Sequence, residues 1–124
     1  MQGDRILLPI LPEYAKSILE GTKRFEFRKT PCRAGTKTIL LYATTPVRAV
    51  VGEVEILDIH VGPPNEIWEI TADAAGISRQ AFNRYYLGHE KAVAYRLGVA
   101  EQYSCPLKLT ELGINYTPQA PVYL

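Results

Sequence analysis

Gly21 separates two apolar patterns of different period, and this change constrains the fold most. Before it, apolar residues recur at helical spacing: Leu11, Ala15, Ile18 and Leu19. Pro12 suits the first turn of that helix, and a glycine commonly ends one. After Gly21, Phe25 and Phe27 alternate with charged residues, which is strand spacing. Residues 11–29 are therefore predicted to form a helix followed directly by a strand.

The rest of the chain predicts further short elements. Apolar runs typical of strands lie at residues 6–10, 38–43, 50–59, 92–97 and 103–109. Gly52 indicates a bulge or a close backbone approach. One helix is expected between residues 62 and 76, and a second over residues 79–87, with Ser78 as its N-cap. Prolines in the tail, residues 116–124, permit only an edge strand.

The predicted element order is β-α-β-β-β-α-α-β-β, with connections short enough for hairpins. This order favours a mixed α+β domain with a small antiparallel or partly closed barrel over a doubly wound sheet. A chain of 124 residues is expected to form a single domain, residues 1–124. That length is sufficient to bury a core without a disulfide or a metal.

Charge is unevenly distributed along the chain. The net charge of +1 predicts no general attraction to nucleic acid or membrane. Residues 21–37, however, contain six basic residues against the single acid Glu26: Lys23, Arg24, Arg28, Lys29, Arg33 and Lys37. A local basic strip of this kind is typical of a surface that binds an anionic partner.

Cysteine and histidine usage predicts a cytoplasmic protein without metal or cofactor. Cys32 and Cys105 are far apart and are expected to be free thiols. The amino terminus is too short and too interrupted by proline for a signal peptide, and no apolar run approaches a membrane span of about 18 residues. His60 and His89 are isolated, and no phosphate-binding glycine loop occurs.

The basic strip has a specific chemical interpretation. Side chains two apart on a strand share a face and lie about 7 Å apart, so Arg24, Glu26 and Arg28 are expected to point the same way. Lys23 is expected at the mouth of a cleft beside the helix. The carboxylate can accept a hydrogen bond from a base, and the arginines can bind phosphate or stack on a base. The alternative is a solvated strand face with weak cross-strand pairs.

Other candidate residues lie further along the chain. Thr44 and Thr45 end a strand, where they either line the rim of the cleft or satisfy the backbone of a turn. Tyr85 and Tyr86 diverge by about 100° on a helix, so one can be buried while the other stacks on a base. We take Tyr86 as the candidate. Lys91 either adds to the positive rim or is simply solvated.

The segment ILPEYAKSILEGTKRFEFRK, residues 10–29, resembles the opening of the ASCH family (activating signal cointegrator homology domains). The family pattern G-x-K-x-x-E-x-R matches Gly21, Lys23, Glu26 and Arg28. The passages LLYATTPVRAVVGEVEI, EIWEITADAAGISRQAFNRYYLG and YTPQAPVYL are similar to later parts of the family pattern.

This resemblance implies a PUA-like fold. Such a fold is a small, partly open β-barrel of about five to six mostly antiparallel strands with two to three flanking helices. The resemblance also implies a cleft between the first helix and the barrel, lined by Lys23, Glu26 and Arg28. The implied partner is RNA or a nucleobase-type ligand. Family members are linked to transcription co-activation, RNA metabolism and hydrolysis of modified nucleosides.

Three functions follow as expectations. The first is a module that binds RNA or a nucleobase. The second is a small hydrolase acting on a modified nucleoside or on RNA, with Lys23 as its catalytic residue. The branch that deacetylates N4-acetylcytidine carries a threonine where this chain has Glu26, so only Lys23 carries over from that branch. The third is a regulatory module that binds a protein partner.

Overall fold

The computed structural model describes residues 4–124; residues 1–3 of the predicted single domain lie outside the described residues. The elements along the chain are β1 (Arg5–Ile10), α1 (Pro12–Glu20), β2 (Phe25–Arg28), β3 (Thr38–Ala43), β4 (Ala49–Gly62), α2 (Pro64–Thr71), the 3-10 turn η1 (Ala72–Ala74), α3 (Arg79–Tyr85), β5 (Ala92–Leu107), the 3-10 turn η2 (Leu109–Leu112) and β6 (Val122–Tyr123).

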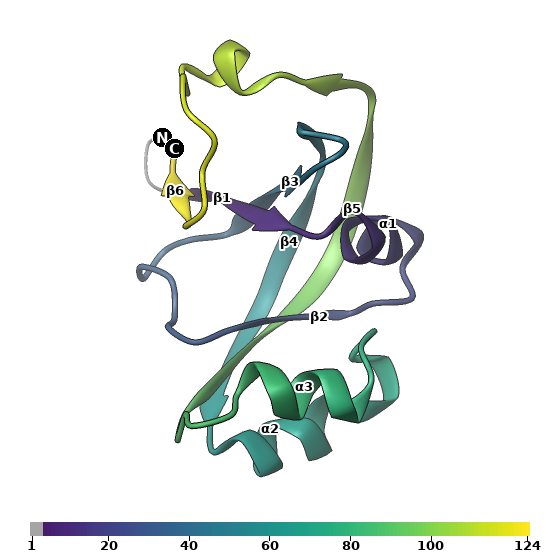
Figure 1. Ribbon diagram of the computed structural model, residues 1–124, viewed down its shortest axis with the longest axis vertical. Helices are drawn as coiled ribbons and strands as arrows, with labels where there is room; N and C mark the ends of the chain where they lie inside the picture. Colours follow the sequence, from purple (N-terminus) through teal and green to yellow (C-terminus); the bar gives the residue numbers. More distant parts are fainter. Residues whose placement is uncertain (1–3) are drawn as a thin grey trace.

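The strands form one curled, open sheet in the order β2-β5-β4-β3-β1-β6 (Figure 1). Strands β1 and β3 pair in parallel, and the other neighbours are antiparallel. With three flanking α-helices, this architecture confirms the predicted α+β, partly open barrel. The short strand β6 lies at a sheet edge, where the prolines of the tail predicted it.

The long ribbon of β4 and β5 differs from the prediction. Residues 92–97 and 103–109 were expected to form two strands, but β5 is continuous from Ala92 to Leu107. Three register shifts in its pairing with β4 let this ribbon bend without ending. One of these shifts lies beside Gly52, where an added Cβ would collide with the carbonyl oxygen of Glu101. The expected close backbone approach is therefore confirmed.

Helix α1 packs one apolar face on the sheet. Pro12 lies in its first turn, and Gly21 ends it with φ of 85°, as the sequence predicts. Ala15 and Ile18 are buried in the main core with apolar residues of β1, β3, β4 and β5. Burying a side chain such as Ile18 contributes about 1.5–3 kcal/mol. This packing fixes the position of α1 beside the sheet.

Helices α2 and α3 form a second apolar cluster with β2. Phe82 of α3 and Ile67 of α2 pack with Phe25 and Phe27. The Ser78 Oγ accepts a hydrogen bond of 3.0 Å from the Ala81 N–H, which confirms the predicted N-cap. Figure 1 shows β2 between α1 on one side and α3 on the other. No helix of the described chain is both long and apolar enough to cross a membrane.

Candidate functional site

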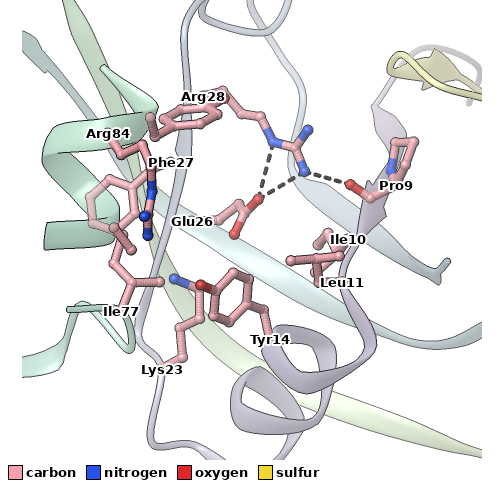
Figure 2. A pocket seen from close by; sticks show the side chains of 12 residues that line it. Pro9, Ile10, Leu11, Tyr14, Lys23, Glu26, Phe27, Arg28, Ile77 and Arg84 are labelled. Atoms are coloured by element: carbon pink, nitrogen blue, oxygen red, sulfur yellow. Dashed lines mark hydrogen bonds and ion pairs between the residues drawn. The ribbon is translucent and has the colours of Figure 1, made fainter. Parts of the chain in front are cut away.

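A cavity of about 430 Å³ lies where α1, β2, α3 and the end of β1 meet (Figure 2). Its charged lining residues are Lys23, Glu26, Arg28 and Arg84. Its other lining residues are Pro9, Ile10, Leu11, Tyr14, Phe27, Ile77, Ala81 and Tyr85. The cavity therefore combines three cations and one carboxylate with apolar and aromatic walls.

Lys23 is buried in the wall of the cavity, with 2% of its surface exposed. Its Nζ donates a hydrogen bond of 2.7 Å to the Ala75 carbonyl oxygen. The same Nζ lies 5.1 Å from the ring centroid of Tyr14 and 5.0 Å from that of Phe27. The sequence placed Lys23 at the mouth of a cleft, and the structure places it deeper.

Gly76 explains how this lysine is buried. The backbone of Gly76 has φ of +71°, and a Cβ built there would collide with the Cβ and Cγ of Lys23. The aliphatic stem of Lys23 therefore passes directly over a residue without a side chain. Gly76 follows Ala75, whose carbonyl oxygen binds the Lys23 ammonium. The connection between α2 and α3 thus contacts both the aliphatic stem and the ammonium group of the Lys23 side chain.

The environment of Lys23 changes its acidity. Burial lowers the pKa of the Lys23 ammonium, because water no longer stabilises its charge. The nearby carboxylate of Glu26 opposes this effect by raising the Lys23 pKa, and the Arg28 guanidinium lowers it further. Lys23 therefore releases its proton more readily than a lysine on the surface.

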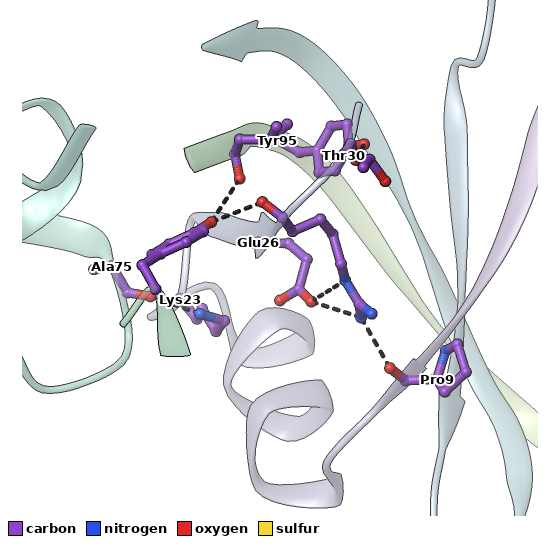
Figure 3. Close-up of polar contacts among 9 residues, drawn as sticks. Pro9, Lys23, Glu26, Thr30, Ala75 and Tyr95 are labelled. Carbon is purple, nitrogen blue, oxygen red and sulfur yellow. Dashed lines mark hydrogen bonds and ion pairs between the residues drawn. The ribbon is translucent and has the colours of Figure 1, made fainter. Parts of the chain in front are cut away.

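Glu26 and Arg28 form a tightly held ion pair (Figure 3). Arg28 places its Nη2 2.8 Å and its Nε 3.1 Å from the same Glu26 oxygen, Oε2. The Nη2 also donates a hydrogen bond of 2.8 Å to the Pro9 carbonyl oxygen on β1. This second contact fixes the guanidinium across the open side of the sheet.

The second oxygen of Glu26 is available to a ligand. Within residues 4–124, no side chain bonds to Oε1, and no fully buried side-chain oxygen lacks a partner, so Oε1 is not fully buried. Glu26 lines the cavity, and Figure 2 shows the oxygen that does not bind Arg28 turned toward Lys23 and Tyr14. The pair therefore presents a free hydrogen-bond acceptor whose carboxylate is already oriented by Arg28.

Arg24 lies outside this group, contrary to the prediction. Strand β2 begins at Phe25, so the expected alternation does not reach Arg24. The Arg24 N–H donates a hydrogen bond of 2.9 Å to the Ala74 carbonyl oxygen. The Arg24 carbonyl oxygen accepts one of 2.9 Å from the Leu97 N–H. The exposed Arg24 side chain lines a separate cavity of about 200 Å³ beside Gly21.

The structure places the two tyrosines of α3 in opposite environments, and Tyr86 is the buried one. It is 3% exposed, and its single hydroxyl proton is donated to the carbonyl oxygen of Arg28 at 2.8 Å, with that of Val93 as a longer, shared acceptor at 3.3 Å. Burial also raises the pKa of Tyr86 above its ordinary range. The choice of Tyr86 as the stacking residue was therefore wrong. Tyr85 is 38% exposed and lines the cavity.

Thr44, Thr45 and Lys91 do not line the cavity. The Thr44 N–H donates to Ile10, and the Thr45 Oγ1 accepts from the Arg48 Nε over 3.3 Å. Neither threonine therefore lines the rim of the cavity. The Thr44 carbonyl oxygen accepts from the Val47 and Arg48 N–H groups of the turn after β3, and the Thr45 hydroxyl binds a side chain and not the backbone. Lys91 is exposed just before β5.

Several lining residues were not predicted from the sequence. Tyr14 comes from α1, Ile77 precedes α3 and Arg84 lies on α3. Figure 2 shows Arg84 on the side of the cavity away from Pro9. Only the packing of α3 beside β2 brings Arg84 near Lys23, so no local pattern indicates it. Within residues 4–124, no group of three histidine, cysteine or acidic side chains is arranged to hold a metal.

The profile of the ASCH domain matches residues 8–104. The chain belongs to the ASCH family. The match includes the elements that supply Lys23, Glu26, Arg28 and Arg84, so the cavity lies within the ASCH domain. The resemblance based on the G-x-K-x-x-E-x-R pattern is thereby confirmed.

Two comparisons with proteins of Zymomonas mobilis extend the family match. An ASCH domain-containing ribonuclease is 37% identical over 92 residues, which are 73% of this chain and 62% of that protein. This chain thus matches less than two thirds of that relative's length. The crystal structure of an ASCH protein from the same organism has a TM-score of 0.88 at 32% identity, covering 98% of this chain and 87% of that one.

A more distant structure shares the fold alone. The N-terminal domain of McrB from Staphylothermus marinus has a TM-score of 0.58 at 14% identity. The likeness covers 100% of this chain and 90% of that one.

Proposed function

We propose that this ASCH domain binds single-stranded RNA and takes one nucleotide into the cavity. The observation that carries the proposal is the group formed by the buried Lys23 and Glu26 with the half-buried Arg28, in which the Glu26 Oε1 remains free. A volume of about 430 Å³ lies within the usual range for small-ligand pockets. The relative named as an ASCH domain-containing ribonuclease supports RNA as the ligand class.

Each part of a nucleotide has a matching group in the cavity. The Glu26 Oε1 accepts a hydrogen bond from an N–H group of the base, and Tyr14 or Tyr85 offers an aromatic face for stacking. Arg28 and Arg84 supply positive charge for a phosphate. A base can enter only when it is unpaired, so the ligand is single-stranded.

The test of this proposal separates recognition of a base by Glu26 from electrostatic attraction between the cations and the RNA phosphates. Labelled single-stranded RNA is titrated with wild type, Glu26→Gln, Arg28→Ala and the exposed control Lys16→Ala. Arg28→Ala removes a cation and weakens binding. Glu26→Gln makes the protein more positive, yet it is expected to weaken binding about tenfold, in line with the loss of a hydrogen bond to a charged group.

Lys16→Ala is the control for the loss of a positive charge outside the cavity. Lys16 lies on α1 and does not line this cavity, so Lys16→Ala is expected to bind within about twofold of wild type. Stronger binding by Glu26→Gln would show that Glu26 only repels phosphate and would contradict the proposal. Thermal unfolding of each variant establishes that the fold is retained.

RNA cleavage is a second candidate function, favoured by the lowered pKa of Lys23. In its neutral form Lys23 accepts the proton of a ribose 2′-hydroxyl, and the 2′-oxygen attacks the adjacent phosphorus. The bond to the 5′-oxygen of the next nucleotide breaks, water protonates that oxygen, and a 2′,3′-cyclic phosphate remains. Incubation with RNA and with its 2′-deoxy analogue tests this reaction: cleavage of RNA alone, lost in Lys23→Met, is the expected result. Equal cleavage of RNA by wild type and Lys23→Met would contradict this reaction.

A further inference from the structure

Three tyrosine hydroxyls hold the chain that leaves the cavity after β2. The Tyr86 hydroxyl donates to the Arg28 carbonyl oxygen over 2.8 Å. The Tyr95 hydroxyl accepts from the Cys32 N–H over 2.7 Å, and the Tyr123 hydroxyl accepts from the Arg33 N–H over 2.8 Å. These tyrosines come from the end of α3, from β5 and from β6. Residues 28–33 therefore have a fixed backbone although they form no regular element beyond Arg28.

Two cations of this segment lie on aromatic rings. The Lys29 Nζ is 4.6 Å from the ring centroid of Tyr85, and the Arg33 guanidinium carbon is 3.9 Å from that of Tyr123. Both basic residues are exposed. Within the described part of the chain, neither forms an ion pair with an acidic side chain. Their positive charges are thus positioned but not neutralised.

The segment continues directly from the proposed nucleotide site. Tyr85 lines the cavity and also carries Lys29, so one ring belongs to both surfaces. From Arg28 to Arg33 the chain spans at most about 18 Å. Figure 1 shows it running from β2 toward the side of the molecule where β6 and the carboxyl terminus lie.

We propose that Lys29, Arg33, Tyr85 and Tyr123 form a second binding surface, the strand track, for RNA that continues out of the cavity. This inference rests on the proposed function and deepens it, because it makes the ligand an oligonucleotide and not a free nucleoside. Cations that follow the phosphates together with aromatic platforms for the bases are the usual means of holding a single strand. A backbone already fixed by hydrogen bonds loses little freedom on binding.

The experiment compares two ligands, a ribonucleoside monophosphate and a single-stranded RNA octamer. Each is titrated into wild type, into the double variant Lys29→Ala/Arg33→Ala and into a control. The control, Lys16→Ala/Lys108→Ala, removes the same charge from two exposed residues, one on α1 and one just before η2, that do not line the cavity. The track variant is expected to lose about tenfold in octamer affinity while its affinity for the monophosphate stays within about twofold. Its salt slope for the octamer falls by about 1.4, which is about 0.7 for each lost phosphate contact.

Tyr85→Leu tests the aromatic ring shared by the cavity and the strand track, because it removes that ring without changing charge. It is expected to weaken octamer binding and leave the salt slope unchanged. Octamer affinity equal in wild type and the track variant, or an equal loss in the control variant, overturns the strand track but leaves the proposed function intact. If wild type binds neither ligand, the proposed function itself is wrong and the track fails with it.

Discussion

Lys23 shows how the surroundings of one residue determine its chemistry. The sequence places it in a basic strip, where a solvated surface lysine is the ordinary outcome. In the structure its ammonium lies between two aromatic rings and donates to the Ala75 carbonyl oxygen. The G-x-K-x-x-E-x-R pattern identifies the residue, but its burial depends on Gly76, which lies 53 positions away in the sequence.

The lowered pKa of Lys23 predicts a pH dependence of stability. In the unfolded chain the pKa returns to its ordinary value of 10.5, so between the two pKa values the unfolded state binds more protons at this residue. The free energy of unfolding of wild type should therefore rise with pH in this window relative to Lys23→Met. Urea unfolding of both proteins from pH 7 to 10 measures the difference in their free energies of unfolding. The tyrosines are the same in both proteins, so their contribution to the pH dependence cancels in this difference. A difference that stays flat or falls would count against a lowered pKa.

At the scale of elements, the amino-terminal half was well predicted. The change of period at Gly21 located α1 and β2, because each has one clear apolar face. The phase of α3 was harder to assign, since a shift of one residue exchanges Tyr85 with Tyr86. The length of β5 was missed because bulges interrupt its alternation, and only pairing with β4 shows that it continues.

The connection between α2 and α3 provides a prediction at this scale. Gly76→Ala places a Cβ against the Lys23 side chain, whereas Gly88→Ala meets no atom within 4 Å, and both glycines have positive φ. Both variants carry the backbone penalty of about 1–3 kcal/mol. Gly76→Ala should be less stable by about a further 1–3 kcal/mol through overpacking. Chemical denaturation of the two variants measures this difference.

RNA binding by Gly76→Ala and Gly88→Ala is a second measurement of the same effect. Displacing Lys23 should weaken RNA binding by Gly76→Ala, while Gly88→Ala should bind as wild type does. Equal stability and equal binding of the two would show that Gly76 does not position the lysine.

At the scale of the whole molecule, the overall composition does not indicate the group of cations that lines the cavity. A net charge of +1 suggests no anionic partner, yet the fold gathers Lys23, Arg28 and Arg84 around one carboxylate. The fold class could be predicted from the order of elements and from the family resemblance. The full lining could not, because β1, α1, β2 and α3 meet only through long-range packing. Arg24, by contrast, is close in sequence but faces another cavity.

Binding of RNA in the cavity itself can be observed residue by residue in an NMR titration of the backbone amides with a single-stranded RNA octamer. If RNA binds in the cavity, the largest shifts are expected at Tyr14, Lys23, Glu26 and Arg84, and they should saturate with one dissociation constant. These shifts should be reduced at equal ligand concentration in Glu26→Gln. Shifts confined to residues outside the cavity and the strand track, or no shifts at all, would contradict binding in the cavity.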